Sequence, residues 1–163
     1  MRTPMSITLS ESLQKIIIEQ LTLEEGYKLK RYKCTEGHWT IGKGYNLDAN
    51  SLKLSQEEIN HLVTYGCSAE RADAMLMDCV KLFCLPECQK YPFWDELCDV
   101  RKYVLIGMIY QMGSIKSWTH TLDALKNKKY PLAAAQMLQS KWAKQTPNRA
   151  VRLADMMKTG ELE

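Results

Sequence analysis

The sequence lacks any apolar stretch that approaches the roughly 20 residues needed to cross a membrane. The run Ile16-Ile17-Ile18 lies between charged residues, and it is too short for the core of a signal peptide. We therefore expect neither membrane insertion nor an export signal.

Motifs for metals, phosphates and nucleic acids are also missing. No Gly-rich loop has a phosphate-binding spacing, and no basic run with interleaved aromatic residues favours a nucleic-acid partner. The chain has six cysteines, Cys34, Cys67, Cys79, Cys84, Cys88 and Cys98. The last four include no C-x-x-C pair and have no nearby His, so we expect reduced thiols rather than a zinc or redox module, which thiol titration and metal analysis would detect. Cys84 and Cys88 could instead pair with each other in an oxidising compartment. We expect no cofactor.

The composition is that of an ordinary globular protein, with 45% apolar and 25% charged residues. A chain of 163 residues suits a single domain, and it can bury about two thirds of its extended surface without disulfides. The net charge of +3 favours an anionic polymer such as the bacterial wall, although a solvated surface explains it more simply. We expect a monomer.

Helical spacing dominates the chain, with one strand-like interruption. A first helix is capped by Ser10 and stopped by Gly26, and residues 29–41 then have strand-like content broken by the turn Thr35-Glu36-Gly37. Ser55-Gln56-Glu57-Glu58 is a capping box that opens another helix. Further helices are expected over residues 68–83, 95–112 (as one or two helices), 118–127, 131–142 and 147–160, the last with Thr146 as its N-cap. The pattern predicts a small hairpin lobe in a mainly helical protein, with a cleft that would suit a long polymer.

Glu25 is the strongest candidate for chemistry. It falls in the last turn of the first helix, where the macrodipole disfavours a negative charge and so raises the pKa of a carboxyl group. A general acid that works near neutral pH needs such a raised pKa. The structural alternative is an exposed glutamate, or one that pairs with a nearby arginine.

Cys34 and Thr40 flank the hairpin turn with even spacing, so they share a face if the two strands pair. Thr40 can orient a water molecule, and Cys34 can accept a proton as a thiolate, although an ordinary thiol is mostly protonated at pH 7. Taken alone, each fits an ordinary strand or core position. Together with Glu25 they supply a proton donor, a water-activating group and a water-orienting group, the set that cleavage of a glycosidic bond requires.

Two groups of short motifs surround these candidates. The first is Leu23-Glu24-Glu25-Gly26, Leu29-Lys30-x-Tyr32, Thr35-Glu36-Gly37 and Thr40-Ile41-Gly42-x-Gly44. The second is Gln111-Met112-Gly113 and Gln145-Thr146-Pro147-Asn148-Arg149-Ala150. These segments closely resemble the phage-type lysozymes, glycoside hydrolase family 24, and within it the T-even phage type. With the helices between them, the resemblance covers about residues 20–160.

The resemblance implies a two-lobe, mainly helical α+β fold. The whole chain, 1–163, would be a single lysozyme domain with a hairpin lobe at about 27–66. Residues at about 10–26 and 67–163 would form the larger helical lobe.

The resemblance also implies hydrolysis of the β-1,4 bond between N-acetylmuramic acid and N-acetylglucosamine in peptidoglycan. The family triad of Glu, Asp and Thr maps with its spacing onto Glu25, Cys34 and Thr40, so a Cys takes the place of the usual Asp. In family terms Glu25 protonates the leaving oxygen, while Cys34 and Thr40 hold the attacking water and the anomer is inverted. Attack on the sugar by the thiolate itself would instead give retention through a covalent intermediate.

Further positions follow from the same resemblance. Arg149 matches the family Arg that pairs with the catalytic Glu. Tyr45 replaces a His that often follows the glycine motif, and Gly66 takes the place of its acidic partner, so this ion pair is expected to be lost as a whole. Substrate-contact positions map onto Asn46, Tyr110, Gln111, Thr121 and Gln136.

We therefore expect an active muramidase, most simply a phage endolysin or a prophage relative that lyses its host cell. It would accumulate in the host cytoplasm before release to the wall, or travel in the virion. The alternative is a catalytically weak protein of this fold that binds peptidoglycan or a partner protein, because the middle residue of the triad is changed. Retention of Glu25, Thr40 and Arg149 favours the enzyme.

Overall fold

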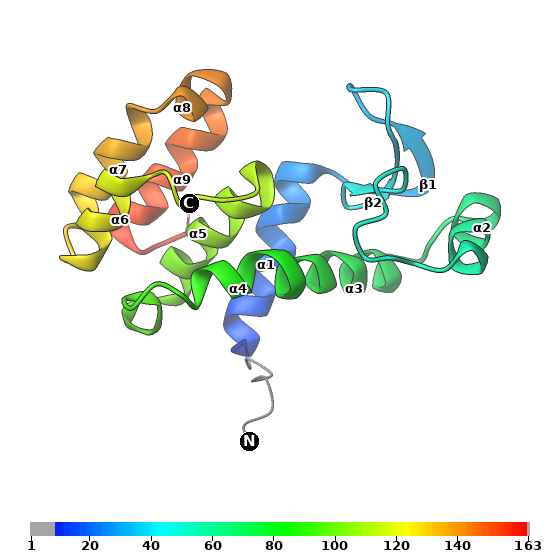
Figure 1. Cartoon of the computed structure of the whole chain (residues 1–163), viewed down its shortest axis with the longest axis horizontal. Helices are drawn as coiled ribbons and strands as arrows, with labels where there is room; N and C mark the ends of the chain where they lie inside the picture. The colour runs from blue at the N-terminus through cyan, green and yellow to red at the C-terminus, as the bar shows by residue number, and fades with distance from the viewer. Residues whose placement is uncertain (1–8, 163) are drawn as a thin grey trace. The chain divides into compact units, whose positions relative to one another are not determined.

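The computed structural model describes residues 9–162 and is mainly helical (Figure 1). Its strands form one antiparallel sheet in the order β1-β2-β3, which confirms the predicted α+β class. The elements are α1 (Glu11–Glu25), β1 (Lys28–Lys33), β2 (Trp39–Gly42), β3 (Tyr45–Asn46), α2 (Gln56–Tyr65), α3 (Ala69–Cys79), the π-helix η1 (Val80–Cys84), α4 (Leu85–Cys88), the 3-10 helix η2 (Trp94–Glu96), α5 (Asp99–Met112), α6 (Thr119–Lys126), α7 (Tyr130–Leu138), α8 (Lys141–Gln145) and α9 (Pro147–Thr159).

Helix α1 begins and ends where its sequence predicts. The Ser10 hydroxyl accepts a hydrogen bond from the Leu13 N–H at 3.0 Å, so it caps the first turn. At the other end Gly26 adopts a positive φ of 70°, and its N–H donates to the Thr22 carbonyl at 2.9 Å. The carboxylate of Glu25 is therefore carried on the last helical residue.

The described chain divides into two compact units. We call residues 18–86 the sheet unit, and residues 9–17 with 87–162 the helical unit. The lobe boundaries predicted from the sequence, about 27–66 for the hairpin lobe, remain a prediction.

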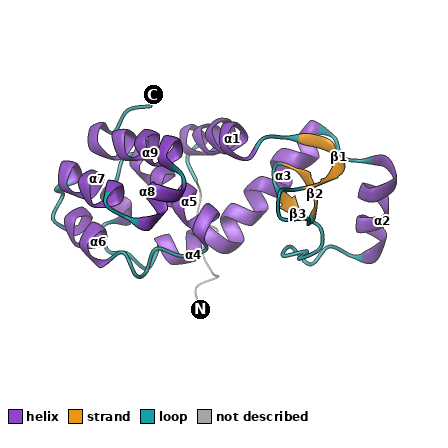
Figure 2. Cartoon of the chain, turned by 90° about the horizontal axis from the view of Figure 1, so that it is seen from above, coloured by secondary structure: helices purple, strands orange, loops and turns teal. Residues whose placement is uncertain are grey.

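In the sheet unit the hairpin is built on the fully buried side chain of Ile41. Tyr32 pairs with Thr40 and Lys33 with Trp39, while an irregularity interrupts the β1–β2 ladder between Lys28 and Tyr32. Helix α3 packs against β2, as the orange strands beside α3 show in Figure 2. The hairpin is thus supported on one side by a helix.

The helical unit is organised around α5, whose middle part is buried on every side. Residues 103–109 of this helix are all buried, which is typical of a central helix rather than a surface one. Helices α7 and α9 pack closely together, and α6 packs against α7 (Figure 1).

Two helices differ from the sequence prediction. The predicted helix 131–142 is two helices, since the Ser140 hydroxyl accepts from the Ala143 N–H and starts α8 anew. The predicted helix 68–83 changes to π-helical hydrogen bonding at Val80. Thr146 precedes α9 as predicted but does not cap it, because its hydroxyl donates to the Trp142 carbonyl at 3.0 Å.

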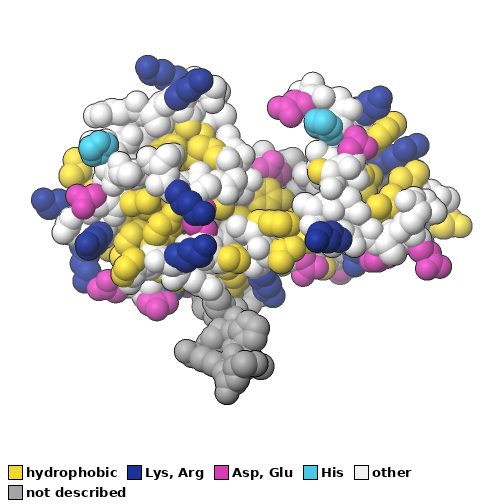
Figure 3. All heavy atoms as spheres, viewed as in Figure 1, with side chains coloured by type: hydrophobic (Ala, Val, Ile, Leu, Met, Phe, Trp, Pro, Cys, Tyr) yellow, Lys and Arg dark blue, Asp and Glu magenta, His cyan; other side chains and the backbone are white. Residues whose placement is uncertain are grey.

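The surface carries charges of both signs. On the face shown in Figure 3, Lys and Arg side chains lie among Asp and Glu side chains rather than forming one basic area. Within residues 9–162, no helix has the length and apolar character that a bilayer-spanning segment would need.

Gly66, at the end of α2, is a position where a side chain cannot fit. Its φ is +77°, and an added Cβ would lie 2.4 Å from the Leu29 carbonyl oxygen, which the Cys67 N–H holds at 2.7 Å. We expect Gly66→Ala to lower the free energy of unfolding by about 2–4 kcal/mol, measured by urea denaturation. Gly113→Ala is the matched control, because Gly113 has a φ of +90° but open space around it. Equal losses in the two variants would contradict the proposed steric cause.

Candidate active site

Glu25 lies against the loop between β2 and β3. The side chain is half-buried, and a Cβ added at Gly44 would lie 3.5 Å from the Glu25 Oε2 atom and 3.4 Å from its Cβ. Gly44 also has a φ of +81°. A glycine at this position therefore lets the loop approach the carboxylate closely, a role that the glycine motif alone did not reveal.

The hairpin places Cys34 and Thr40 as their spacing predicts. Cys34 directly follows β1, and two turn hydrogen bonds hold it: its N–H donates to the His38 carbonyl, and the Gly37 N–H donates to the Cys34 carbonyl, both at 2.9 Å. Thr40 lies in β2 opposite Tyr32 and is only 4% exposed. Because β1 and β2 pair, side chains at positions 32, 34 and 40 face the same side of the hairpin.

The turn favours ionisation of the Cys34 thiol. Backbone hydrogen bonds from His38 and Glu36 lower the pKa of Cys34, and a hydrogen bond with the Thr40 hydroxyl adds to them. Partial burial and the negative charge of Glu36 oppose this shift without reversing it. Cys34 therefore carries more thiolate at neutral pH than an ordinary cysteine, and a thiolate can accept a proton from water.

The Thr40 hydroxyl has one proton for two partners. It donates to the His38 carbonyl at 3.0 Å, and it also interacts with the Cys34 sulfur. A hydroxyl cannot donate to both at once, so ionisation of Cys34 would draw this proton from the carbonyl towards sulfur. Cys34 and Thr40 form a coupled pair rather than two separate groups.

Tyr32 is a neighbour of the site that the sequence did not single out. Its hydroxyl interacts electrostatically with Cys34 and with Glu25, and its ring lies 4.6 Å from the Lys28 Nζ atom. Tyrosine is common in strands, so its presence here does not indicate a site residue. Its position two residues before Cys34, however, predicts that its side chain lies on the same face of the strand as Cys34.

The sequence predicts that the His–acid ion pair of the family is lost at Tyr45 and Gly66, and a different ion pair is present in the same unit. Lys43, only 7% exposed, forms an ion pair with Asp73 of α3, and so links the loop after β2 to that helix. Lys43 occupies the variable position of the glycine motif, and nothing local in the sequence indicates its distant partner.

Asn46, a predicted substrate contact, has a local structural partner in the sheet unit. Its side-chain oxygen accepts a hydrogen bond from the Ala49 N–H at 2.9 Å, and its backbone carbonyl accepts from Asn50 at the same distance. Tyr45 is likewise structural, because its buried hydroxyl donates to Asn50 and accepts from Leu52. These bonds hold the loop after β3.

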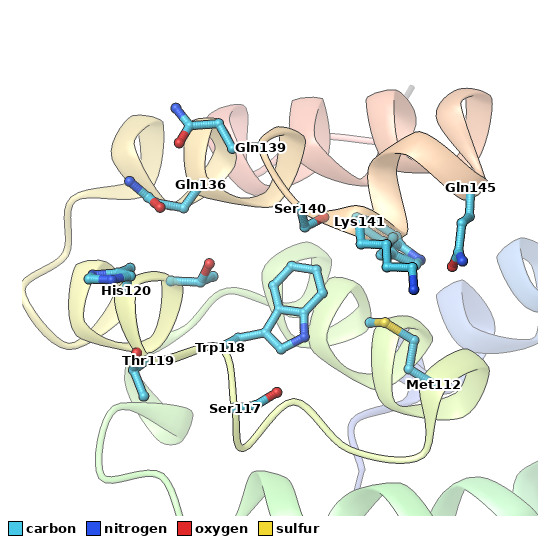
Figure 4. A pocket seen from close by; sticks show the side chains of 12 residues that line it. Met112, Ser117, Trp118, Thr119, His120, Gln136, Gln139, Ser140, Lys141 and Gln145 are labelled. Carbon is cyan, nitrogen blue, oxygen red and sulfur yellow. The ribbon is translucent and has the colours of Figure 1, made fainter.

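Two other predicted contacts, Thr121 and Gln136, meet at a pocket of about 490 Å³ in the helical unit (Figure 4). Trp118 and Trp142 line the same pocket, with ring centroids 5.6 Å apart in an edge-to-face arrangement. Gln111 adjoins it, since its side-chain oxygen accepts from the Trp142 Nε1 at 2.8 Å. Aromatic rings bordered by amides and hydroxyls are suited to a polar ligand with apolar faces, such as a sugar.

The remaining predicted residues also lie in the helical unit. Tyr110 is half-buried on α5, and Arg149 is half-buried on α9; neither lines the tryptophan pocket. Within residues 9–162 no cluster of three or more His, Cys, Asp or Glu side chains could hold a metal ion. Cys34 is half-buried, whereas Cys79, Cys84 and Cys88 are buried.

Comparison with known proteins finds relatives that cover most of this chain. Two proteins of Dictyostelium discoideum, described as probable T4-type lysozymes 1 and 2, are 31% and 30% identical to this chain. The similarity covers 90% and 89% of this chain, and 95% of each relative. The pre-baseplate central spike protein Gp5 of Enterobacteria phage T4 is 27% identical over 89% of this chain, which corresponds to 28% of the spike protein.

The family model that matches describes phage lysozymes and extends over residues 22–155. This range contains Glu25, Cys34 and Thr40 as well as the tryptophan pocket. The chain belongs to the phage lysozyme family.

Proposed function

We propose that this protein is a muramidase in which a cysteine takes the part of the usual second carboxylate. Membership of the phage lysozyme family implies a glycoside hydrolase with peptidoglycan as its substrate. The proposal goes further on two points: the bond cleaved is the β-1,4 linkage between N-acetylmuramic acid and N-acetylglucosamine, and specific residues are assigned to its cleavage. The Cys34–Thr40 pair carries this proposal, because the turn stabilises a thiolate beside a hydroxyl that can orient water.

The reaction follows from these groups. Glu25 donates a proton to the leaving glycosidic oxygen as its bond to the anomeric carbon breaks. A water molecule held by Thr40 attacks that carbon and loses a proton to the Cys34 thiolate, so the product anomer is inverted. The turn hydrogen bonds to Cys34 keep its sulfur in place for that transfer.

The sugar at the new reducing end tests this assignment. Purified peptidoglycan digested by the protein is reduced with borohydride and its fragments are identified by mass spectrometry. We expect reduced muramic acid at the new ends, because cleavage after N-acetylmuramic acid exposes its anomeric carbon. Reduced glucosamine would indicate a glucosaminidase, and 1,6-anhydro ends would indicate attack by the substrate's own hydroxyl; either result would overturn the proposal. Tight binding without any new ends would support the alternative of a glycan-binding protein.

The setting in which the enzyme works is a separate proposal. We infer that it lyses a bacterial host as an endolysin, present in the cytoplasm until release to the wall, or that it is carried in the virion. Fractionation of producing cells with an antibody against the chain distinguishes these cases. Recovery solely with purified virions would exclude the endolysin.

A further inference from the structure

The hairpin sorts its side chains onto two faces, and Tyr32 lies on the face of the candidate active site. On the opposite face Arg31 stacks on the Trp39 ring at 4.1 Å, and Lys33 lies 5.2 Å from the same ring. Alternation along β1 then puts Tyr32 with Cys34, and the register puts it across from Thr40. Tyr32 therefore lies on the active-site face, two residues before Cys34 and directly across from Thr40.

The Tyr32 ring contacts a cation and is partly buried. The Lys28 ammonium lies 4.6 Å from the ring centroid, a distance that favours a cation–π contact. The side chain is half-buried, and the negative charges of Cys34 and Glu25 both act on its hydroxyl through space. One neutral hydroxyl therefore lies within electrostatic range of both groups that change charge in the proposed reaction.

We propose that Tyr32 is a positioning residue of the active site, whose hydroxyl donates to Glu25 and Cys34 as each becomes negative and so orients them for proton transfer. This inference rests on the proposed function. Glu25 becomes negative when it has given its proton to the leaving oxygen, and Cys34 is negative before it receives one from water. A single donor near both groups would stabilise the charged form of each in turn.

Burial and the charges around Tyr32 keep its hydroxyl protonated, as a donor must be. Burial, and then the negative charges of Cys34 and Glu25, raise the pKa of Tyr32, so its proton is retained throughout the neutral range. Lys28 is the cation that faces the ring, and Glu36 is the further charge that acts on Cys34. Tyr32 therefore acts as a donor and not as a competing base.

Tyr32→Phe tests the proposal because it removes only the oxygen and leaves the ring under Lys28. The first readout is the rate at which iodoacetamide alkylates Cys34 between pH 6 and 10, followed at the Cys34 peptide by mass spectrometry. We expect the alkylation rate at pH 7 to fall about two- to fivefold and the midpoint to move to higher pH, because the thiolate has lost a nearby donor. The second readout is kinetics on soluble peptidoglycan fragments, where we expect kcat to fall about tenfold with KM within about twofold.

Tyr65→Phe is the matched control, since Tyr65 is 73% exposed on α2 of the same unit. It should leave both readouts unchanged. An unchanged Cys34 titration together with unchanged kcat in Tyr32→Phe would overturn the proposal, as would a change in KM alone. If the parent protein hydrolyses no peptidoglycan, the proposed function fails, but the alkylation profile still decides whether Tyr32 acts on Cys34.

Discussion

Glu25→Gln is expected to lower the rate of peptidoglycan hydrolysis by ~10²–10⁴-fold, because the amide N–H is far too weakly acidic to protonate the leaving oxygen. The two side chains have nearly the same shape, so the contact with the Gly44 loop should remain. The loss should therefore appear in kcat, with KM little changed. Release of reducing ends from purified peptidoglycan measures it.

Glu24→Gln provides the matched control for this prediction. Glu24 precedes Glu25 on the same helical turn and is also half-buried, so it controls for removal of one negative charge at the end of α1. We expect its activity to stay within about twofold of the parent. Urea denaturation should give both variants similar free energies of unfolding. Equal activity of Glu25→Gln and the parent would remove Glu25 from the mechanism.

Cys34→Ala is expected to cost about 10²-fold or more in kcat, because no group then accepts the proton from the attacking water. Cys34→Asp should keep or raise the activity. An aspartate ionises near pH 4 and is fully charged when a general acid such as Glu25 is still protonated. A thiol with a lowered pKa still ionises later than a carboxyl group, so fewer molecules carry both groups in the correct state at once.

Chemical modification gives the same test without mutation. Iodoacetamide should abolish activity of the parent and leave Cys34→Asp active. Cys98→Ala is the control, because Cys98 is exposed and its loss should change neither activity nor inactivation. Full activity of Cys34→Ala would show that the thiol has no part in hydrolysis.

Much of the hairpin could be predicted because its determinants are local. Gly26 ends α1 directly after Glu25, and the Glu36-Gly37 turn sets the spacing between Cys34 and Thr40. These features depend on residues a few positions apart, where capping and turn preferences act. The chemistry of the candidate triad is accordingly visible in the sequence.

Features that depend on distant partners could not be predicted in the same way. Lys43 finds Asp73 on α3 only once the sheet has formed, and the steric demand on Gly66 comes from the Leu29 carbonyl. The lowered pKa of Cys34 depends on which backbone N–H groups point at sulfur, and residue types do not encode that direction. The break before α8 was local, but the alanine-rich helical pattern around Ser140 concealed it.

The most direct test of the account is the pH dependence of hydrolysis in the parent and in Cys34→Asp. The account predicts a bell-shaped profile for the parent, with a rise and then a fall as pH increases, because hydrolysis needs protonated Glu25 and the Cys34 thiolate at the same time. In Cys34→Asp the rise should move to much lower pH, towards the pKa of a carboxyl group. Superimposable profiles for the two proteins would contradict the claim that Cys34 activates the water.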